Sequence, residues 1–208
     1  MQAWLPVVYG IALGAALSFP VRLLCSFLLK QRGFDPAMER KHFWMLLGAL
    51  ALIGGVIGWR AGVSFRGLYL LLILFVAACA FYIDAKNRVI PNELVLAVLV
   101  LAAAFGLTGT IHFQIWQSLL GLVVCFVIFF IPGLFGKQVG AGDVKLAASM
   151  GFALGLTGSL YAIAAMGALV LLYTFLDNRL PLAERLKTMI PMGPFLALGL
   201  VAVSIILV

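Results

Sequence analysis

Long apolar runs separated by short polar segments dominate the sequence. A helix needs about 20 apolar residues to cross a bilayer, because each residue adds about 1.5 Å along its axis. Six runs fit one helix each, over residues 3–29, 43–59, 67–83, 92–107, 115–135 and 194–208. The run over residues 144–176 is too long for one helix, and Gly155 with Thr157-Gly158 predicts a tight turn near its middle. The pattern therefore predicts eight spans, or six or seven if residues 144–155 are too short to cross.

Composition places these helices in a membrane. Hydrophobic residues make up 65% of the chain and charged residues 10%, whereas a soluble domain carries about 25% charged residues. The net charge of +7 fits the basic loops of a membrane protein, and so few polar residues leave no folded patch for nucleic acid. The polar segment 177–187 is amphipathic and is expected to lie in the membrane interface. We therefore expect an all-α, polytopic membrane helix bundle.

The basic residues favour one orientation of the chain. If the N-terminus lies outside and every predicted span crosses, Arg60 and Arg66 lie on the outer side. The other twelve of the fourteen Lys and Arg residues then lie on the inner side. The positive-inside rule assigns the richer side to the cytoplasm. In this arrangement Asp84 and Asp143 both stand at cytoplasmic ends of spans.

Asp84 and Asp143 are the candidates for chemistry in a chain with only seven acidic residues. A carboxylate within a bilayer is costly unless it is hydrated, paired or protonated. Two close carboxylates share a proton, so one can activate water while the other protonates the scissile carbonyl, as in an aspartic protease. Gly140 and Gly142, just before Asp143, leave room for an extended substrate backbone. The pattern predicts peptide-bond hydrolysis that needs neither a metal nor a cofactor.

Each feature also has a simpler explanation. Asp143 before an apolar run can be a helix N-cap, and Asp84 near Lys86 can be an ordinary interfacial charge. Lys86 and Lys145 fit the role of positive-inside anchors. Two other functions compete with a peptidase: a proton- or cation-coupled transporter using both aspartates, and a structural assembly subunit in which they only cap helices. The transporter is disfavoured because both acids stand at one edge and no internal repeat is evident.

The three cysteines give no sign of a metal site. Cys25, Cys79 and Cys125 all lie inside apolar runs, and no two of them have the spacing of metal ligands. We expect them to pack as small apolar residues.

Three segments in fixed order resemble the bacterial type IV prepilin peptidases, relatives of the archaeal preflagellin peptidases and of the wider GxGD group that includes presenilin. They are Asp84 with Ile90-Pro91-Asn92, then Gly140-Ala141-Gly142-Asp143-Val144-Lys145-Leu146, then the proline-glycine start of the last span, Ile190-Pro191-Met192-Gly193-Pro194-Phe195-Leu196-Ala197. The resemblance covers about residue 67 to the C-terminus. It implies an N-terminal two-helix region with a short basic cytoplasmic loop, residues 1–66, and a six-helix aspartyl protease core, residues 67–208.

The resemblance also implies roles for individual residues. Asp84 and Asp143 would be the catalytic pair, and the substrate-binding residues would be Gly140, Gly142, Lys145, Pro91 and Asn92. The substrate would be a prepilin or pseudopilin in the bacterial inner membrane, whose basic leader is cut at the cytoplasmic face. Glu93, Asp177 or Glu184 is expected to meet that leader. A presenilin-like intramembrane protease is the closest alternative within the enzyme class, and the Ile-Pro-Asn segment and the short chain favour the prepilin type.

One feature of the family is missing from the first polar loop. Many members carry two Cys-x-x-Cys pairs there, and they also methylate the new N-terminus with S-adenosylmethionine. Here the loop covers about residues 30–42 and contains no cysteine, which excludes a cysteine-ligated structural zinc site within it. We therefore expect a peptidase alone, with S-adenosylmethionine as a cofactor only if methyltransferase activity is retained.

Overall fold

The computed structural model describes residues 4–111, 113–135, 140–176 and 191–207, and the elements within these ranges are all helices. They are α1 (Leu5–Gln31), α2 (Arg40–Ala61), α3 (Phe65–Asn87), α4 (Asn92–Leu107), α5 (Ile115–Leu134), α6 (Ala141–Leu176) and α8 (Gly193–Leu207). By length and composition, α1, α2, α3, α5 and α6 can each cross a membrane, while α4 and α8 are shorter apolar helices. The predicted all-α, polytopic bundle is confirmed. The number of crossings stays a prediction.

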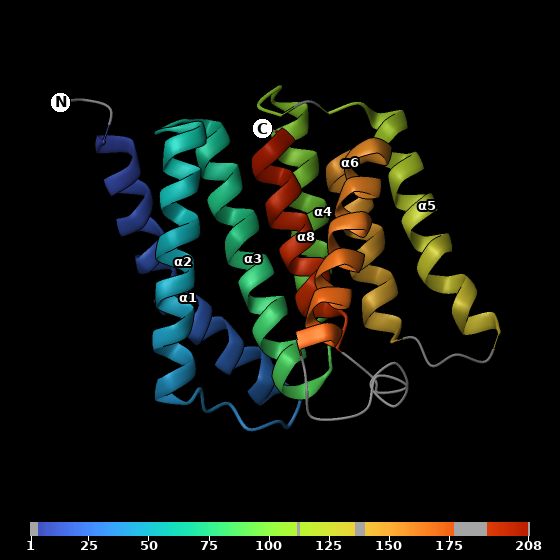
Figure 1. Ribbon diagram of the computed structural model, residues 1–208, viewed down its shortest axis with the longest axis horizontal. Helices are drawn as coiled ribbons and strands as arrows, with labels where there is room; N and C mark the ends of the chain where they lie inside the picture. The colour runs from blue at the N-terminus through green and yellow to red at the C-terminus, as the bar shows by residue number, and fades with distance from the viewer. Residues whose placement is uncertain (1–3, 112, 136–139, 177–190, 208) are drawn as a thin grey trace.

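The long apolar run contains the predicted turn. At Gly155 the backbone has φ 69° and ψ 178°, so α6 consists of two helical segments that meet there. A side chain at Gly158 would touch Leu207, near the end of α8, whereas Tyr173 packs on Phe195, near its start, with ring centroids 5.9 Å apart. The second segment of α6 therefore runs antiparallel to α8, and it returns to the end of the bundle where α6 begins (Figure 1).

Several helices begin or end outside the apolar runs that predicted them. Helix α2 begins at Arg40 rather than Phe43, α3 continues to Asn87 rather than Ile83, and α6 begins at Ala141 rather than Val144. Backbone hydrogen bonding continues past the last apolar residue wherever the helix reaches water, so hydropathy underestimates these lengths. The amphipathic segment predicted over residues 177–187 lies outside the described residues.

Glycines let neighbouring helices approach closely. A Cβ at Gly14 of α1 would overlap the Leu50 carbonyl and lie 3.0 Å from the Cα of Gly54 in α2. Gly121 of α5 and Gly151 of α6 are in the same relation. Without a hydrophobic force between helices in lipid, such backbone contact provides the packing energy. These two pairs hold α1 to α2 and α5 to α6.

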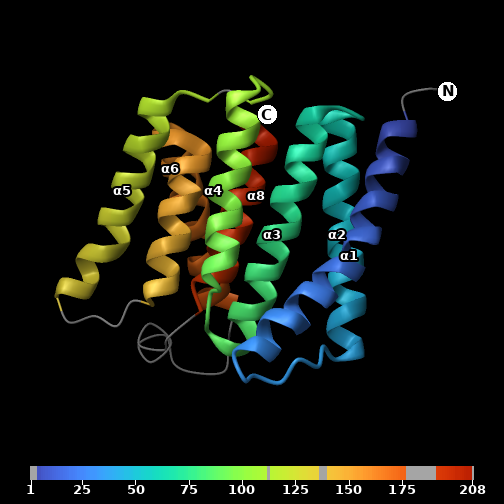
Figure 2. The same ribbon diagram turned by 180° about the vertical axis from the view of Figure 1, so that it is seen from behind.

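Helix α3 lies at the centre of the bundle and is the most buried of the candidate spans (Figures 1 and 2). It packs against α1, α2, α4 and α8. Its start is capped by the Ser64 hydroxyl, which accepts a hydrogen bond of 3.1 Å from the Gly67 N–H. The cysteines behave as predicted, since Cys25, Cys79 and Cys125 are all buried and free.

Three chain connections and the start of α6 place the polar residues. The α1–α2 and α3–α4 connections and the start of α6 lie at one end of the bundle, and the α2–α3 connection lies at the other (Figure 2). Arg60 and Arg66 border that α2–α3 connection. Asp84, near the end of α3, and Asp143, near the start of α6, therefore lie at the same end of the bundle, opposite Arg60 and Arg66.

Candidate active site

Asp84 lies in the last turn of α3 and is almost completely buried, with 4% of its surface exposed. The helix ends because Arg88 adopts the left-handed conformation, with φ 55°, and its N–H donates to the Asp84 carbonyl at 2.8 Å. The Asp84 side chain accepts a hydrogen bond of 3.1 Å from the backbone N–H of Gly193, at the start of α8. A carboxylate is therefore held inside the bundle by one backbone donor.

Gly193 packs directly on this carboxylate. A Cβ at Gly193 would lie 2.6 Å from Oδ2 and 2.7 Å from Cγ of Asp84, distances at which atoms overlap. Only glycine fits this position without displacing Asp84. The Pro191-Met192-Gly193-Pro194 segment was predicted only as the start of the last span. The glycine between prolines was the available signal, but nothing in the sequence shows that it touches Asp84.

Asp143 stands in the first turn of α6, which begins two residues earlier at Ala141. Its Oδ1 atom is buried and has no hydrogen-bond partner in the described part of the chain. The side chain therefore does not act as an N-cap through Oδ1, and an unpaired buried oxygen costs about 1–3 kcal/mol. Asp84, in the last turn of α3, lies at the same end of the bundle as the start of α6 (Figure 2). The fold thus brings the two aspartates, far apart in sequence, into one site.

The glycines before Asp143 are constrained by this site. A Cβ at Gly140 would lie 2.9 Å from Oδ2 of Asp143, and one at Gly142 would lie 3.0 Å from the Cβ of Ile90. Gly142 therefore lets the start of α6 pack against the segment that precedes α4.

The Ile90-Pro91-Asn92 segment meets α6 through a second contact. Pro91 is the residue just before α4, which begins at Asn92. The Asn92 side-chain oxygen accepts a hydrogen bond of 3.0 Å from the Lys145 ammonium. Lys145, considered above as a membrane anchor, is thus bonded within the site, one turn from Gly142. Six of the seven predicted residues lie at or just before the starts of α4 and α6, and the seventh, Asp84, lies at the same end of the bundle. Their roles stay predictions.

Two ion pairs hold the surrounding loops in place. Lys86 donates to Asp35 and to the Ala37 carbonyl, at 3.3 Å and 2.8 Å, and so fixes the α1–α2 connection beside the end of α3. The backbone N–H of Ala37 and the Lys86 ammonium hold the pKa of the Asp35 carboxyl below its usual range. Arg32 pairs with Glu93 at 2.5 Å and ties α1 to α4.

One of these ion pairs involves Glu93, a residue expected to contact the basic leader of a substrate. Glu93 is already bonded to Arg32, although 54% of its side chain remains exposed. Asp177 and Glu184, the other two, lie outside the described residues. Within the described ranges no three His, Cys, Asp or Glu side chains gather as metal ligands.

Comparison with known proteins relates this site to a family. Residues 69–175, just over half of the chain, match the model of the type IV leader peptidase family. The prepilin leader peptidase/N-methyltransferase of Pseudomonas aeruginosa is 31% identical over 171 residues, which cover 76% of this chain and 56% of that protein. The chain thus aligns with little more than half of this relative's length. No solved structure matches. The matched residues include both aspartates and the Asn92–Lys145 bond, and the chain belongs to the type IV leader peptidase family.

Proposed function

We propose that the chain is a membrane aspartyl endopeptidase that removes the basic leader from type IV prepilins or pseudopilins. The observation that carries this is the pair of carboxyl groups, Asp84 and Asp143, which sit on two helices at the same end of the bundle. The relative from Pseudomonas aeruginosa, named as a prepilin leader peptidase, supports the substrate class.

The two carboxyl groups differ in their partners, and this difference supports a separate role for each. Asp84 accepts an N–H bond from Gly193, which favours its ionised form, so it takes a proton from water. The water oxygen then attacks the scissile carbonyl carbon. Asp143 has no such donor at Oδ1 among the described residues, so it holds the shared proton and donates it to the carbonyl oxygen. Collapse of the tetrahedral intermediate returns that proton to Asp143, breaks the C–N bond, and delivers the proton on Asp84 to the leaving amine.

The position of the pair suits a bond next to a hydrophobic helix. Asp84 stands in the last turn of α3 and Asp143 in the first turn of α6, so both lie at the ends of apolar helices rather than in their middle. A substrate whose apolar segment lies in the bilayer and whose leader lies in the cytoplasm would bring the bond between them to the level of the two aspartates. A transporter, in contrast, usually places its coupling groups near the midplane.

The basic residues support a cytoplasmic position for this end, in a bacterial inner membrane with the N-terminus outside. The α1–α2 and α3–α4 connections and the helix turns beside them carry Arg32, Arg40, Lys41, Lys86 and Arg88, against Arg60 and Arg66 at the other end. We propose the peptidase reaction alone. Methylation is named for the relative, but the α1–α2 connection here lacks cysteine, and S-adenosylmethionine enters only if that second activity is retained.

Leader cleavage of a co-expressed prepilin, followed by gel shift, tests the proposal. Wild type is expected to cut, while Asp84→Asn and Asp143→Asn are inert although still inserted in the membrane. Glu39→Gln is the control, because Glu39 is an exposed acid just before α2, at the same end of the bundle, and this variant should cut like wild type. Cleavage by either site variant at the wild-type rate would show that the aspartates are structural.

A further inference from the structure

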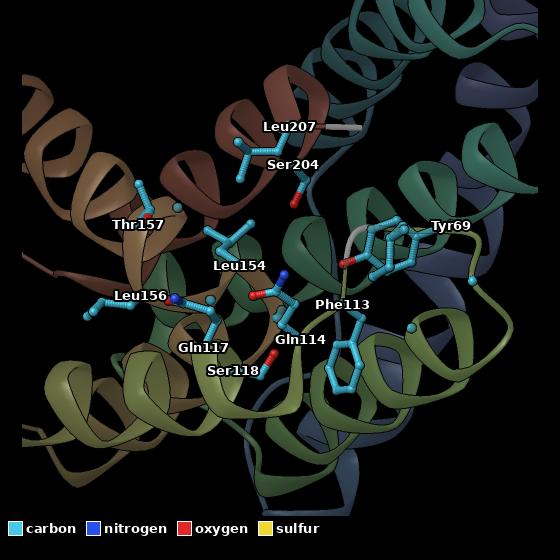
Figure 3. Close-up of a pocket in the computed structure, with 16 residues that line it drawn as sticks. Tyr69, Phe113, Gln114, Gln117, Ser118, Leu154, Leu156, Thr157, Ser204 and Leu207 are labelled. Carbon is cyan, nitrogen blue, oxygen red and sulfur yellow. The ribbon is translucent and has the colours of Figure 1, made fainter.

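The end of the bundle opposite Asp84 and Asp143 contains a cavity of about 610 Å³, formed by residues of α3, α4, α5, α6 and α8 and by the connection between α4 and α5 (Figure 3). Tyr69 near the start of α3 and Ser204 near the end of α8 lie in its wall, whereas Asp84 and Gly193 lie at the far ends of those helices. The proposed peptidase chemistry uses none of the residues that line it.

The wall of this cavity mixes apolar residues with polar, uncharged side chains. Its polar side chains are Tyr69, Gln114, Gln117, Ser118, Thr157 and Ser204, and no Asp, Glu, Lys or Arg is among the described residues that line it. A buried charge would find no counter-charge there, so a charged group is excluded by its desolvation cost. Amides and hydroxyls instead match a ligand that carries hydroxyl groups of its own.

The Ser204 hydroxyl in this wall lacks a hydrogen-bond partner among the described residues. The residue is 1% exposed. In Figure 3 its oxygen points into the cavity, toward the Gln114 amide, and the Tyr69 phenol points in from the side. Buried serine hydroxyls elsewhere in the bundle bond a carbonyl of their own helix, as Ser159 does with Leu156 at 2.8 Å. A partner supplied from outside the chain would satisfy Ser204.

Two cations stand beside the cavity. Arg66 donates to the Thr110 carbonyl at 3.2 Å, between the lining residues Gly109 and Ile111. Arg60 donates to the Ile206 carbonyl at 3.2 Å, next to the lining residue Leu207. Both arginines are exposed, and neither pairs with a carboxylate in the part of the chain that the structure covers. Each guanidinium keeps N–H groups free for an anion.

We propose that this cavity binds the uncharged, hydroxyl-bearing head group of an anionic glycerophospholipid, whose phosphate lies beside Arg60 and Arg66. The head-group hydroxyls bond Ser204, Tyr69 and the glutamine amides. Phosphatidylglycerol has this chemistry. Phosphatidylethanolamine would bring an ammonium group into a wall without acids, and cardiolipin would bring a second phosphate into a wall without bases.

Thermal unfolding in nanodiscs tests the proposal without any peptidase assay. Wild-type protein in phosphatidylcholine discs is compared with discs that also contain phosphatidylglycerol, phosphatidylethanolamine or cardiolipin. Phosphatidylglycerol is expected to give the largest rise in Tm. An equal rise with cardiolipin would show that only surface charge is recognised, and an equal rise with free glycerol would show that no lipid is. No rise with any probe would mean that water alone fills the cavity. Each of these three results overturns the proposal.

A pair of serine variants isolates the cavity. Ser204→Ala removes the unpaired hydroxyl, so it is expected to leave Tm in phosphatidylcholine discs equal or higher and to weaken phosphatidylglycerol binding about fivefold. Ser159→Ala removes a bonded hydroxyl, so it should lower Tm in every disc and leave the rise with phosphatidylglycerol intact. If both variants keep the full rise, Ser204 is no ligand and the proposal fails. Gln117→Leu gives a second, independent loss of binding from the same wall.

Discussion

The contact between Gly193 and Asp84 predicts a large effect from one methyl group. In Gly193→Ala the new Cβ would begin 2.6 Å from Oδ2 of Asp84, so the two atoms must separate by about 0.8 Å to reach ordinary contact at 3.4 Å. The same movement stretches the hydrogen bond from the Gly193 N–H. Since a displacement of about 1 Å at a reacting group can cost 10²-fold, we expect kcat to fall about 10²-fold, or about 2.7 kcal/mol in activation free energy.

The measurement is single-turnover cleavage of a prepilin by purified protein, normalised to the folded fraction, because overpacking also destabilises by about 1–3 kcal/mol. Gly48→Ala is the matched control. A Cβ at Gly48, in α2, meets no atom of the described residues within 4 Å, so this variant should cut like wild type and be slightly more stable. If Gly193→Ala, folded and inserted, cuts at the wild-type rate, then Gly193 does not position Asp84 and the assignment of Asp84 as the base loses its support.

Three further predictions concern the rest of this end of the bundle. Gly142→Ala should lower kcat by about tenfold, less than Gly193→Ala, because its Cβ would meet Ile90 at 3.0 Å and not a carboxylate. Equal losses of kcat in the two glycine variants would contradict this order. Lys145→Met breaks the bond to Asn92 and should raise KM more than it lowers kcat, as steady-state kinetics would show, whereas a pure kcat loss would place Lys145 in the chemistry. A backbone N–H and a lysine ammonium depress the pKa of Asp35, so their stabilisation of the α1–α2 connection is present at neutral pH and lost as pH falls through that lowered pKa. Limited proteolysis of the connection should therefore increase at low pH in wild type, and already at neutral pH in Asp35→Asn. If Asp35→Asn is cut like wild type at neutral pH, Asp35 does not hold the connection.

Much of the fold could be read from hydropathy because a membrane leaves few alternatives to helices. Apolar runs located every described helix, and the glycine at 155 marked the turn within α6. Helix ends were placed up to four residues short, since polar residues such as Asn87 continue a helix into the interface. The division of the chain at residue 66 remains a prediction.

The pairing of Asp84 with Asp143 could be predicted because topology alone brings both to one end. Contacts between distant segments could not. Gly193 bonds Asp84 across 109 residues, and no local pattern states which carboxylate a glycine will face. The cavity beside Ser204 was equally hidden, because a serine in an apolar helix usually bonds its own backbone and only the assembled bundle shows that this one does not.

The central claim is that Asp84 and Asp143 work as one unit, and the double variant tests it most directly. Single-turnover cleavage is measured for Asp84→Asn, Asp143→Asn and the combined variant, each confirmed as inserted and folded. Residues that act as a unit are strongly non-additive, so each single variant should lose as much activity as the double variant. Losses that add, or a single variant that still cuts within about tenfold of wild type, would contradict a shared proton and the mechanism built on it.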